Sequence, residues 1–153
     1  MRAFLGLGTN LGDREATLRR AVEHLATFGD VVAVSGLYET EPMGGPPQGL
    51  FLNLVVGLDT EASPEVLLDR CRLLETEANR VRTVRNGPRT LDVDVLFVEG
   101  AARNTEELMV PHPRMFERRF VLAPLRELAP DLVSEAQIEA AGGEVVRIGS
   151  LDT

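Results

Sequence analysis

RVRTVRNGPRTLDVDVLFV, residues 80 to 98, joins a cluster of arginines to a candidate β-strand that carries two alternating aspartates. Along residues 91 to 98 the period of two puts Asp92 and Asp94 on one face of the strand, with their Cα atoms roughly 7 Å apart. The opposite face carries the apolar side chains of Leu91, Val93, Val95 and Phe97. The stretch therefore predicts a strand with one face towards the core and an acidic face towards a site.

The acidic pair favours a cation, because like charges this close repel each other unless a positive charge lies between them. Mg²⁺ fits such a pair, since it typically takes one or two carboxylates together with phosphate oxygens and water. An ordinary polar strand face gives the same Asp-x-Asp pattern, so the aspartates alone leave both readings open.

A basic cluster lies just upstream of the aspartates. It consists of four arginines within ten residues, Arg80, Arg82, Arg85 and Arg89. The chain has no lysine, so the choice of arginine carries no information and only the clustering counts. Such a cluster suits a polyanionic ligand, although a solvated surface loop is the alternative. Next to the aspartates, the cluster favours metal-bound phosphate.

Composition limits the class of protein. The chain has 153 residues, 44% hydrophobic and 26% charged, which predicts one domain over residues 1–153 with a real core. A formal charge of −8 argues against a nucleic-acid binder with a broad basic surface. We expect no signal peptide, no membrane span and a cytoplasmic location. The single cysteine, Cys71, lies in an apolar helical pattern and is expected to be a packed thiol.

Periodicity predicts the order of elements. Strand patterns cover residues 2–7, 31–40, 51–59 and 91–98, and helical patterns cover residues 13–28 and 63–79. This β-α-β-β-α-β order predicts an α+β, ferredoxin-like fold, an antiparallel sheet with helices on one face. A further helical pattern begins at Phe120, and residues 145–148 suggest a short edge strand. These are the C-terminal additions.

Three other features are candidate ligand contacts, each with a structural alternative. Phe51 and Asn53 share one strand face, where a phenyl ring could stack on a flat ligand while the amide reads its polar edge. An ordinary polar strand residue would look the same. His112, in a proline-rich turn, could contact phosphate or be structural. The Gly- and Pro-rich stretch 43–49 is either a plain connection or a lid.

Taken together, five blocks resemble the 6-hydroxymethyl-7,8-dihydropterin pyrophosphokinase family of folate biosynthesis. They are GLGTNLGD, YETEPMG, FLNLVV, RVRTVRNGPRTLDVDVL and VPHPRMFERRFVLAPLRELAP, in the family's order over residues 3 to 133. The resemblance implies an Mg²⁺-dependent diphosphotransferase that moves pyrophosphate from ATP to the pterin alcohol, giving AMP and the pterin diphosphate. The alternatives are a non-catalytic ferredoxin-like module that binds a nucleotide or pterin, and a protein-interaction domain.

The resemblance also implies roles for individual residues. Asp92 and Asp94 would hold two Mg²⁺ ions, and Arg80 and Arg89 would join them as catalytic groups. The implied ATP-binding residues are Glu75, Arg80, Arg85, Arg89, His112 and Arg118. The implied pterin-binding residues are Thr40, Glu41, Met43, Phe51, Asn53 and Phe120, with the two phenylalanines sandwiching the ring.

The chain departs from the family at two places in the arginine loop. Asn86 stands where many members have tryptophan, and Asn79 replaces a common glycine, so loop motion is where this chain should differ. We expect a monomer that binds ATP and a reduced pterin alcohol and no nucleic acid, with possible association with neighbouring folate enzymes. The sequence after residue 133 indicates no role.

Overall fold

The elements follow the predicted order in a computed structural model, which describes residues 1–41, 49–78 and 91–151. The first part of the chain forms β1 (Arg2–Thr9), α1 (Arg14–Leu25), β2 (Asp30–Val34), β3 (Leu37–Thr40), β4 (Phe51–Asp59), α2 (Pro64–Glu77) and β5 (Asp92–Val98). The C-terminal part adds β6 (Arg103–Asn104), β7 (Met109–Val110), the 3₁₀ helix η1 (Met115–Glu117), α3 (Arg119–Leu128), α4 (Glu135–Ala140) and β8 (Val145–Gly149).

The central sheet has the order β5-β1-β4-β3-β8, and β2 also pairs with β4. Every pair of neighbouring strands in this sheet is antiparallel. The predicted α+β fold with a β-α-β-β-α-β order is therefore confirmed. The expected edge strand near residue 145 is β8, which pairs with β3.

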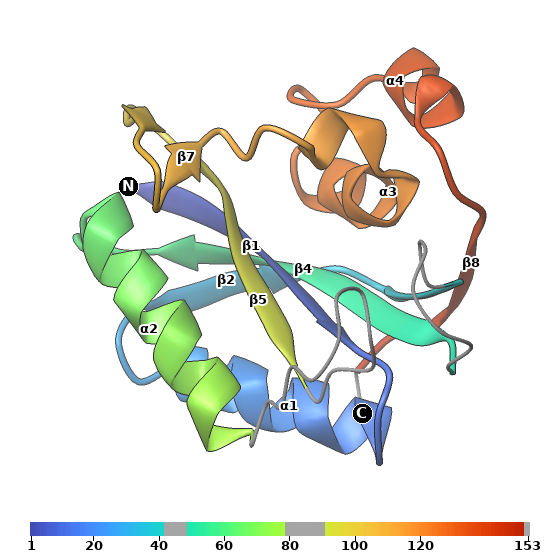
Figure 1. The fold of residues 1–153 in the computed structure, drawn as a ribbon, viewed down its shortest axis with the longest axis horizontal. Coiled ribbons are helices and arrows are strands. Elements are labelled where there is room, and N and C mark those ends of the chain that lie inside the picture. The colour runs from blue at the N-terminus through green and yellow to red at the C-terminus, as the bar shows by residue number, and fades with distance from the viewer. Residues whose placement is uncertain (42–48, 79–90, 152–153) are drawn as a thin grey trace.

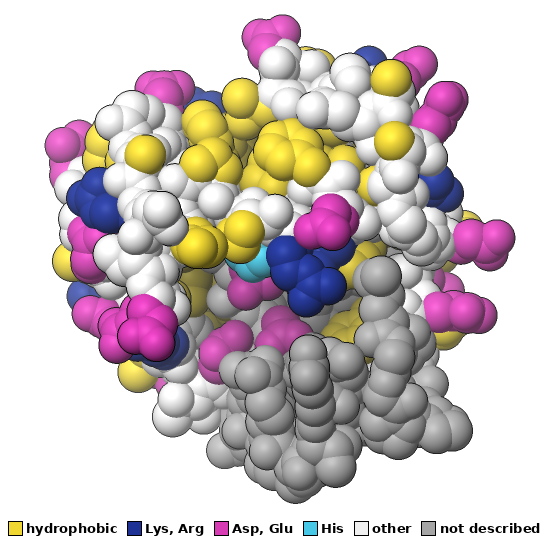
Figure 2. All heavy atoms as spheres, turned by 45° about the horizontal axis from the view of Figure 1, so that its top comes forward, with side chains coloured by type: hydrophobic (Ala, Val, Ile, Leu, Met, Phe, Trp, Pro, Cys, Tyr) yellow, Lys and Arg dark blue, Asp and Glu magenta, His cyan; other side chains and the backbone are white. Residues whose placement is uncertain are grey.

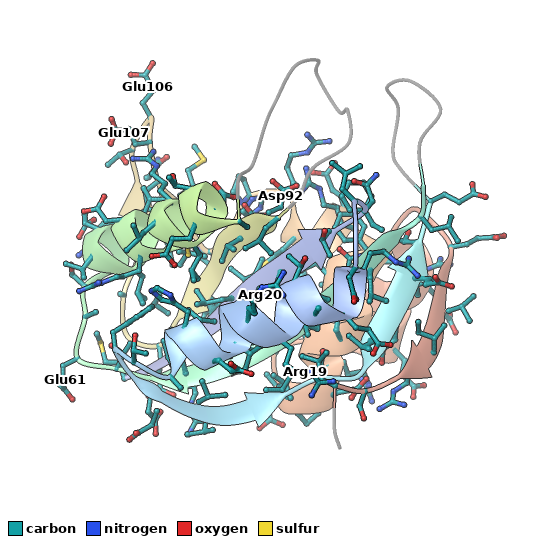
Figure 3. The ribbon with its side chains drawn as sticks, turned by 90° about the horizontal axis from the view of Figure 1, so that it is seen from below. Arg19, Arg20, Glu61, Asp92, Glu106 and Glu107 are labelled. Carbon is teal, nitrogen blue, oxygen red and sulfur yellow. The ribbon has the colours of Figure 1, made fainter. Side chains whose placement is uncertain are left out.

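Helices cover both faces of the sheet (Figure 1). On one face α1 and α2 lie side by side, and Leu18 and Leu67 pack with Leu5 and Leu54 of the sheet (Figure 3). The prediction of helices on one face holds for this pair. On the other face α3 packs through Leu122 onto a second cluster of buried residues. The C-terminal addition thus creates a second layer, and the site lies at its edge.

Local signals in the sequence explain where the first two helices begin. The Asp13 side chain accepts a hydrogen bond from the Ala16 amide at 3.1 Å, which caps α1. Ser63 caps α2 in the same way, and Pro64 occupies the first helical turn. Cys71 of α2 is buried and burial raises the pKa of its thiol, which confirms a packed cysteine.

The strand predicted over residues 31–40 is divided into β2 and β3. Ser35 interrupts the ladder, because its amide donates to Val55 O while its hydroxyl accepts from the Val55 amide, both at 2.9 Å. At Gly36 an added Cβ would lie 2.4 Å from Nε of Arg147. The interruption therefore coincides with hydrogen bonds between Ser35 and Val55 of β4, which local periodicity does not reveal.

A bulge in β5 changes which side chains face the core. Val95 pairs with Leu5 and Phe97 pairs with Phe4, so Leu96 is an extra residue in β5. Val93 and Val95 face α1 and α2 as predicted, but Leu96 and Phe97 pack on the α3 side. The prediction that Phe97 shares a face with Val93 and Val95 was wrong, because the extra residue reverses the alternation.

Within the described ranges, no helix has the length and apolar character needed to cross a bilayer.

Candidate functional site

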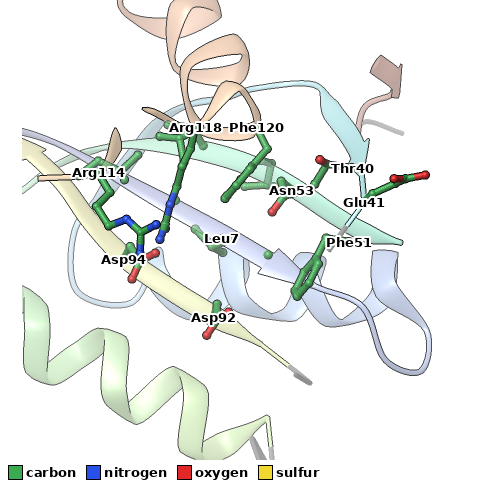
Figure 4. Close-up of a pocket in the computed structure, with 16 residues that line it drawn as sticks. Leu7, Thr40, Glu41, Phe51, Asn53, Asp92, Asp94, Arg114, Arg118 and Phe120 are labelled. Atoms are coloured by element: carbon green, nitrogen blue, oxygen red, sulfur yellow. The ribbon is translucent and has the colours of Figure 1, made fainter. Parts of the chain in front are cut away.

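A cavity of about 220 Å³ lies between the α3 face of the sheet and the start of α3. It gathers most of the predicted ligand contacts that the structure describes: Thr40, Glu41, Phe51, Asn53, Asp92, Asp94, Arg118 and Phe120. Figure 4 shows that these residues divide the cavity into two ends, with charged side chains at one and aromatic side chains at the other. We call them the charged end and the ring end.

Two glycines of β1 form the floor. Gly8 lies between Asp92 of β5 and Asn53 of β4, and Gly6 lies opposite Asp94. A Cβ on Gly8 would be 2.5 Å from Oδ1 of Asn53, which is closer than real contacts allow. The strand pattern of the sequence covers only residues 2–7. The structure extends β1 to Thr9 and gives this glycine a direct reason, since only glycine leaves room for the asparagine amide.

The charged end begins with the predicted pair of aspartates on β5. Asp92 and Asp94 both line the cavity and both are half-buried. Between them, the Val93 amide donates to Oε2 of Glu75 at 2.9 Å. Because β5 is an edge strand, this bond from α2 fixes backbone that no neighbouring strand holds on that side. Glu75 supports the pair from behind and does not line the cavity.

The donor set fits a hard divalent cation. Two carboxylates on one strand face are the protein ligands that Mg²⁺ typically takes. In the part of the chain that the structure describes, no group of three or more acidic, histidine or cysteine side chains could hold a metal. A cation at this pair would therefore take its remaining ligands from water and from ligand oxygens, as expected for a metal that arrives with phosphate.

Two guanidinium groups converge on the same end from the opposite side. Arg118 and Arg114 both line the cavity and reach towards Asp94 (Figure 4). Burial lowers the pKa of Arg118, and repulsion from Arg114 lowers it further, while Asp94 opposes the shift. Two like charges so close favour an anion between them. Sequence reasoning missed Arg114, and its position two residues after His112 was the available signal.

His112 lies beside this end without lining the cavity. Its Nδ1 accepts a hydrogen bond from the Arg114 amide at 3.2 Å, which leaves Nε2 to carry the proton of the neutral ring. Burial lowers the pKa of His112 and the charges of Arg118 and Arg114 add to this effect, against the attraction of Asp94. At neutral pH the ring is therefore an uncharged donor. Figure 2 shows arginine, histidine and acidic side chains meeting below a group of hydrophobic ones.

The ring end carries an unsatisfied amide. Asn53 is only 6% exposed, and its Nδ2 has no hydrogen-bond partner among the described residues. A buried donor left unpaired costs about 1–3 kcal/mol, so such a group is explained by a ligand that accepts from it. Phe51 and Phe120 lie on either side of Asn53 in Figure 4. Both rings are half-buried.

Thr40 and Glu41 complete the ring end at the edge of β3. Thr40 pairs with Phe51 across the ladder, and its hydroxyl donates to Glu144 O at 3.0 Å. Glu41 is exposed at the rim. Phe120 is held from the other side by Arg118, whose guanidinium carbon lies 5.7 Å from the ring centroid.

Four predicted site residues, Arg80, Arg85, Arg89 and Met43, lie outside the described residues. Their roles stay predictions, as do the consequences of Asn79 and Asn86.

Known proteins resemble this chain over most of its length. The 2-amino-4-hydroxy-6-hydroxymethyldihydropteridine pyrophosphokinase of Methylorubrum extorquens is 50% identical over 148 residues, covering 95% of this chain and 89% of that protein. The protein of the same name from Bacillus subtilis is 45% identical over 150 residues, with the same coverage.

A solved structure of an HPPK-DHPS protein in complex with substrates shares the fold, with a TM-score of 0.62 and 14% identity over 92% of this chain and 42% of that one. The family model described as 7,8-dihydro-6-hydroxymethylpterin-pyrophosphokinase matches residues 4–130. By this match and by its close relatives, the chain belongs to the 7,8-dihydro-6-hydroxymethylpterin-pyrophosphokinase family.

Proposed function

We propose that this chain transfers pyrophosphate from ATP to 6-hydroxymethyl-7,8-dihydropterin, with Mg²⁺, and releases AMP and the pterin diphosphate. Membership of the pyrophosphokinase family assigns the reaction. The observation that supports it in this molecule is the division of one cavity into a ring end and a charged end. A flat heterocycle and a polyphosphate need those two environments side by side.

At the ring end, Phe51 and Phe120 would stack on the two faces of the pterin. Asn53 would donate its free Nδ2 hydrogens to acceptors on the ring edge, which would give this buried amide the partner it lacks. Thr40 and Glu41 would contact the rim of the same ligand, and Met43 is proposed for this end on the family resemblance alone.

At the charged end, Asp92 and Asp94 would hold Mg²⁺, and the family resemblance suggests two ions. When bound, the metal would neutralise phosphate oxygens and bring them to a fixed place. Arg118, Arg114 and the neutral His112 would contact the phosphates of ATP from the opposite side. Arg80, Arg85 and Arg89 are proposed to add to this charge. Glu75 would act here through the Val93 amide, which donates to its Oε2.

In the reaction, the hydroxymethyl oxygen of the pterin attacks the β-phosphorus of ATP and AMP leaves. Stacking and the Asn53 amide would fix the direction of the pterin, so the hydroxymethyl group points to the charged end. The arginines would stabilise charge that develops on the phosphoryl oxygens. No described residue stands out as a general base, and Asp92 would orient the hydroxyl group.

The test is an assay with ATP, Mg²⁺ and the reduced pterin alcohol, followed by separation of nucleotides and pterins. We expect AMP and the pterin diphosphate in equal amounts. A module that only binds its ligands would retain ATP or pterin without releasing AMP. A protein-interaction domain would show no Mg²⁺-dependent binding of ATP. Either result would overturn the proposal.

We further propose that the chain acts as a cytoplasmic, single-domain monomer. Association with other folate enzymes is a separate proposal, and it is supported by the HPPK-DHPS protein, of which this chain covers 42%.

A further inference from the structure

The C-terminal residues 141–149, which we call the strap, run from the start of α3 to the edge of β3 (Figure 1). The start of α3 and the edge of β3 are the two sides of the ring end, because Phe120 lies in the first turn of α3 and Thr40 ends β3. The sequence alone indicates no role for this segment. Its contacts at both sides suggest one.

At the α3 side the strap is held by the residue that precedes Phe120. The Arg119 amide donates to Gly142 O at 3.1 Å, and the Gly142 amide donates to Glu117 O at 3.1 Å. The Arg119 guanidinium donates to the carbonyls of Ile138, Glu139 and Ala141, each at 2.9 Å. One arginine thus satisfies three carbonyls where α4 ends and the strap begins.

At the β3 side the strap becomes β8 and contacts Thr40 directly. Thr40 pairs with Val145 in the ladder, and its hydroxyl donates to Glu144 O at 3.0 Å. The side chain of this pocket residue is therefore oriented by the strap. Its hydroxyl oxygen keeps a lone pair that can accept from a ligand.

A third set of hydrogen bonds joins the strap to α3 and β3, which form the two walls of the ring end. Glu127 of α3 accepts hydrogen bonds from the Gly36 amide at 3.0 Å, from the Tyr38 hydroxyl and from Nε of Arg147 at 3.2 Å. Burial raises the pKa of Tyr38 to about 12, and the bond to Glu127 contributes to this shift. The hydroxyl therefore stays protonated and donates across the whole physiological range. Tyr38 is the ladder partner of Asn53, so the two side chains lie side by side on the face of the sheet that α3 covers.

We propose that the strap sets the spacing between the two walls of the ring end, and that Arg119 and Arg147 are positioning residues for the pterin. The inference rests on the proposed assignment of the ring end to the pterin. Spacing matters there because stacking uses dispersion, and a gap of about 0.5–1 Å between two atoms forfeits roughly a quarter to a half of their attraction.

The charged end is supported by other elements. Asp92 and Asp94 lie on β5, which is held by β1 and by Glu75 of α2. The hydrogen bonds that the strap makes within the described chain go to α3, α4, η1 and β3. Gly142 also forms an isolated parallel bridge with Arg118, a residue of the charged end.

The test compares Arg119→Ala with Arg126→Ala, a matched control. Arg126 also lies on α3 and also donates to a backbone carbonyl, Val133 O at 2.9 Å, but it does not contact the strap. For Arg119→Ala we expect the KM for the pterin to rise about fivefold to tenfold while the KM for ATP changes less than twofold. Arg126→Ala should leave both KM values unchanged even if its melting temperature falls.

Arg147→Ala is the second variant, because this exposed side chain can be removed without opening the core. It should raise the KM for the pterin in the same direction by a smaller factor. Equal increases in both KM values, or a lowered melting temperature with neither KM changed, would overturn the role of the strap. A wild-type protein that releases no AMP would instead overturn the proposed function, so the two failures are distinguishable.

Discussion

Gly8→Ala should weaken the binding of the pterin and leave the binding of ATP unchanged. Gly8 lies in β1 beneath the ring end, and the new Cβ would stand 2.5 Å from Oδ1 of Asn53. An ordinary carbon–oxygen contact is about 3.3–3.6 Å. The amide must therefore move by about 1 Å or rotate. The backbone itself should tolerate alanine, since Gly8 lies in a regular strand with no positive φ.

The magnitude follows from the hydrogen bonds that the displaced amide would lose. A neutral hydrogen bond contributes about 0.5–1.5 kcal/mol, and an acceptor on the ligand left unpaired in a buried site costs about 1–3 kcal/mol. A loss of about 1.5–3 kcal/mol in pterin binding corresponds to roughly a tenfold to hundredfold weaker affinity. Folding stability should change little, because removing a glycine from a strand offsets part of any strain.

The assay is calorimetric titration with the pterin and, separately, with ATP and Mg²⁺. Gly6→Ala is the matched control, because it lies two positions away on the same strand face and its Cβ would meet only the Leu96 side chain, at 3.3 Å. We expect weaker pterin binding for Gly8→Ala alone and unchanged ATP binding for both variants. Pterin affinity within twofold of wild type for Gly8→Ala would refute the claim that Asn53 reads the ring.

Three further predictions concern the charged end and the hydrogen bonds that Glu127 accepts beside the ring end. Asp94→Ala should lower kcat by roughly a thousandfold or more, because the metal loses one of its two carboxylates; near-normal turnover at saturating Mg²⁺ would exclude the metal role. Glu75→Ala should lower both kcat and the melting temperature by leaving the Val93 amide unpaired, whereas Glu75→Gln should restore both, since an amide oxygen still accepts; no rescue by glutamine would mean that charge is what matters. Burial alone would raise the pKa of Glu127, but the hydrogen bonds that its carboxylate accepts outweigh burial and lower the pKa. The ionised carboxylate therefore stabilises the fold above the ordinary carboxyl range, and this stabilisation is lost as the pH falls through the lowered pKa. Urea unfolding should therefore show Glu127→Gln less stable by about 1.5–3 kcal/mol at pH 7, with the difference narrowing as the pH falls through the lowered pKa of Glu127; a difference that did not depend on pH would contradict this assignment.

Short-range periodicity predicted the parts of the site that lie on regular strands. The alternation in β4 placed Phe51 and Asn53 together, and the alternation in β5 placed Asp92 beside Asp94; both pairs line the cavity. These predictions succeed because the side-chain period of a strand is a local property. The role of Gly8 was missed because it depends on the strand that pairs beside it.

The remaining features depend on contacts between distant residues. Phe97 was assigned to the wrong face because a bulge is set by the pairing of β5 with β1. The division of β2 from β3 coincides with hydrogen bonds from Ser35 to Val55 on another strand. Arg114 follows a turn, and the direction of a turn side chain is fixed only when α3 packs on the sheet. Local patterns do not reveal the bulge or the division of the strand, and for Arg114 they offer only its position two residues after His112.

The last strand also has a consequence for self-association. β3 would be an edge of the sheet without β8, and an uncovered edge presents a row of free amides and carbonyls to any other chain. By pairing with β3, β8 hides most of this row, and the side chains that it turns outward include the exposed Val146 and Ile148. A chain shortened before residue 145 would lose Leu151 from the first core, and it would expose β3 as a template for strand addition between molecules. The C-terminal strand therefore moves the edge of the sheet from β3 to β8.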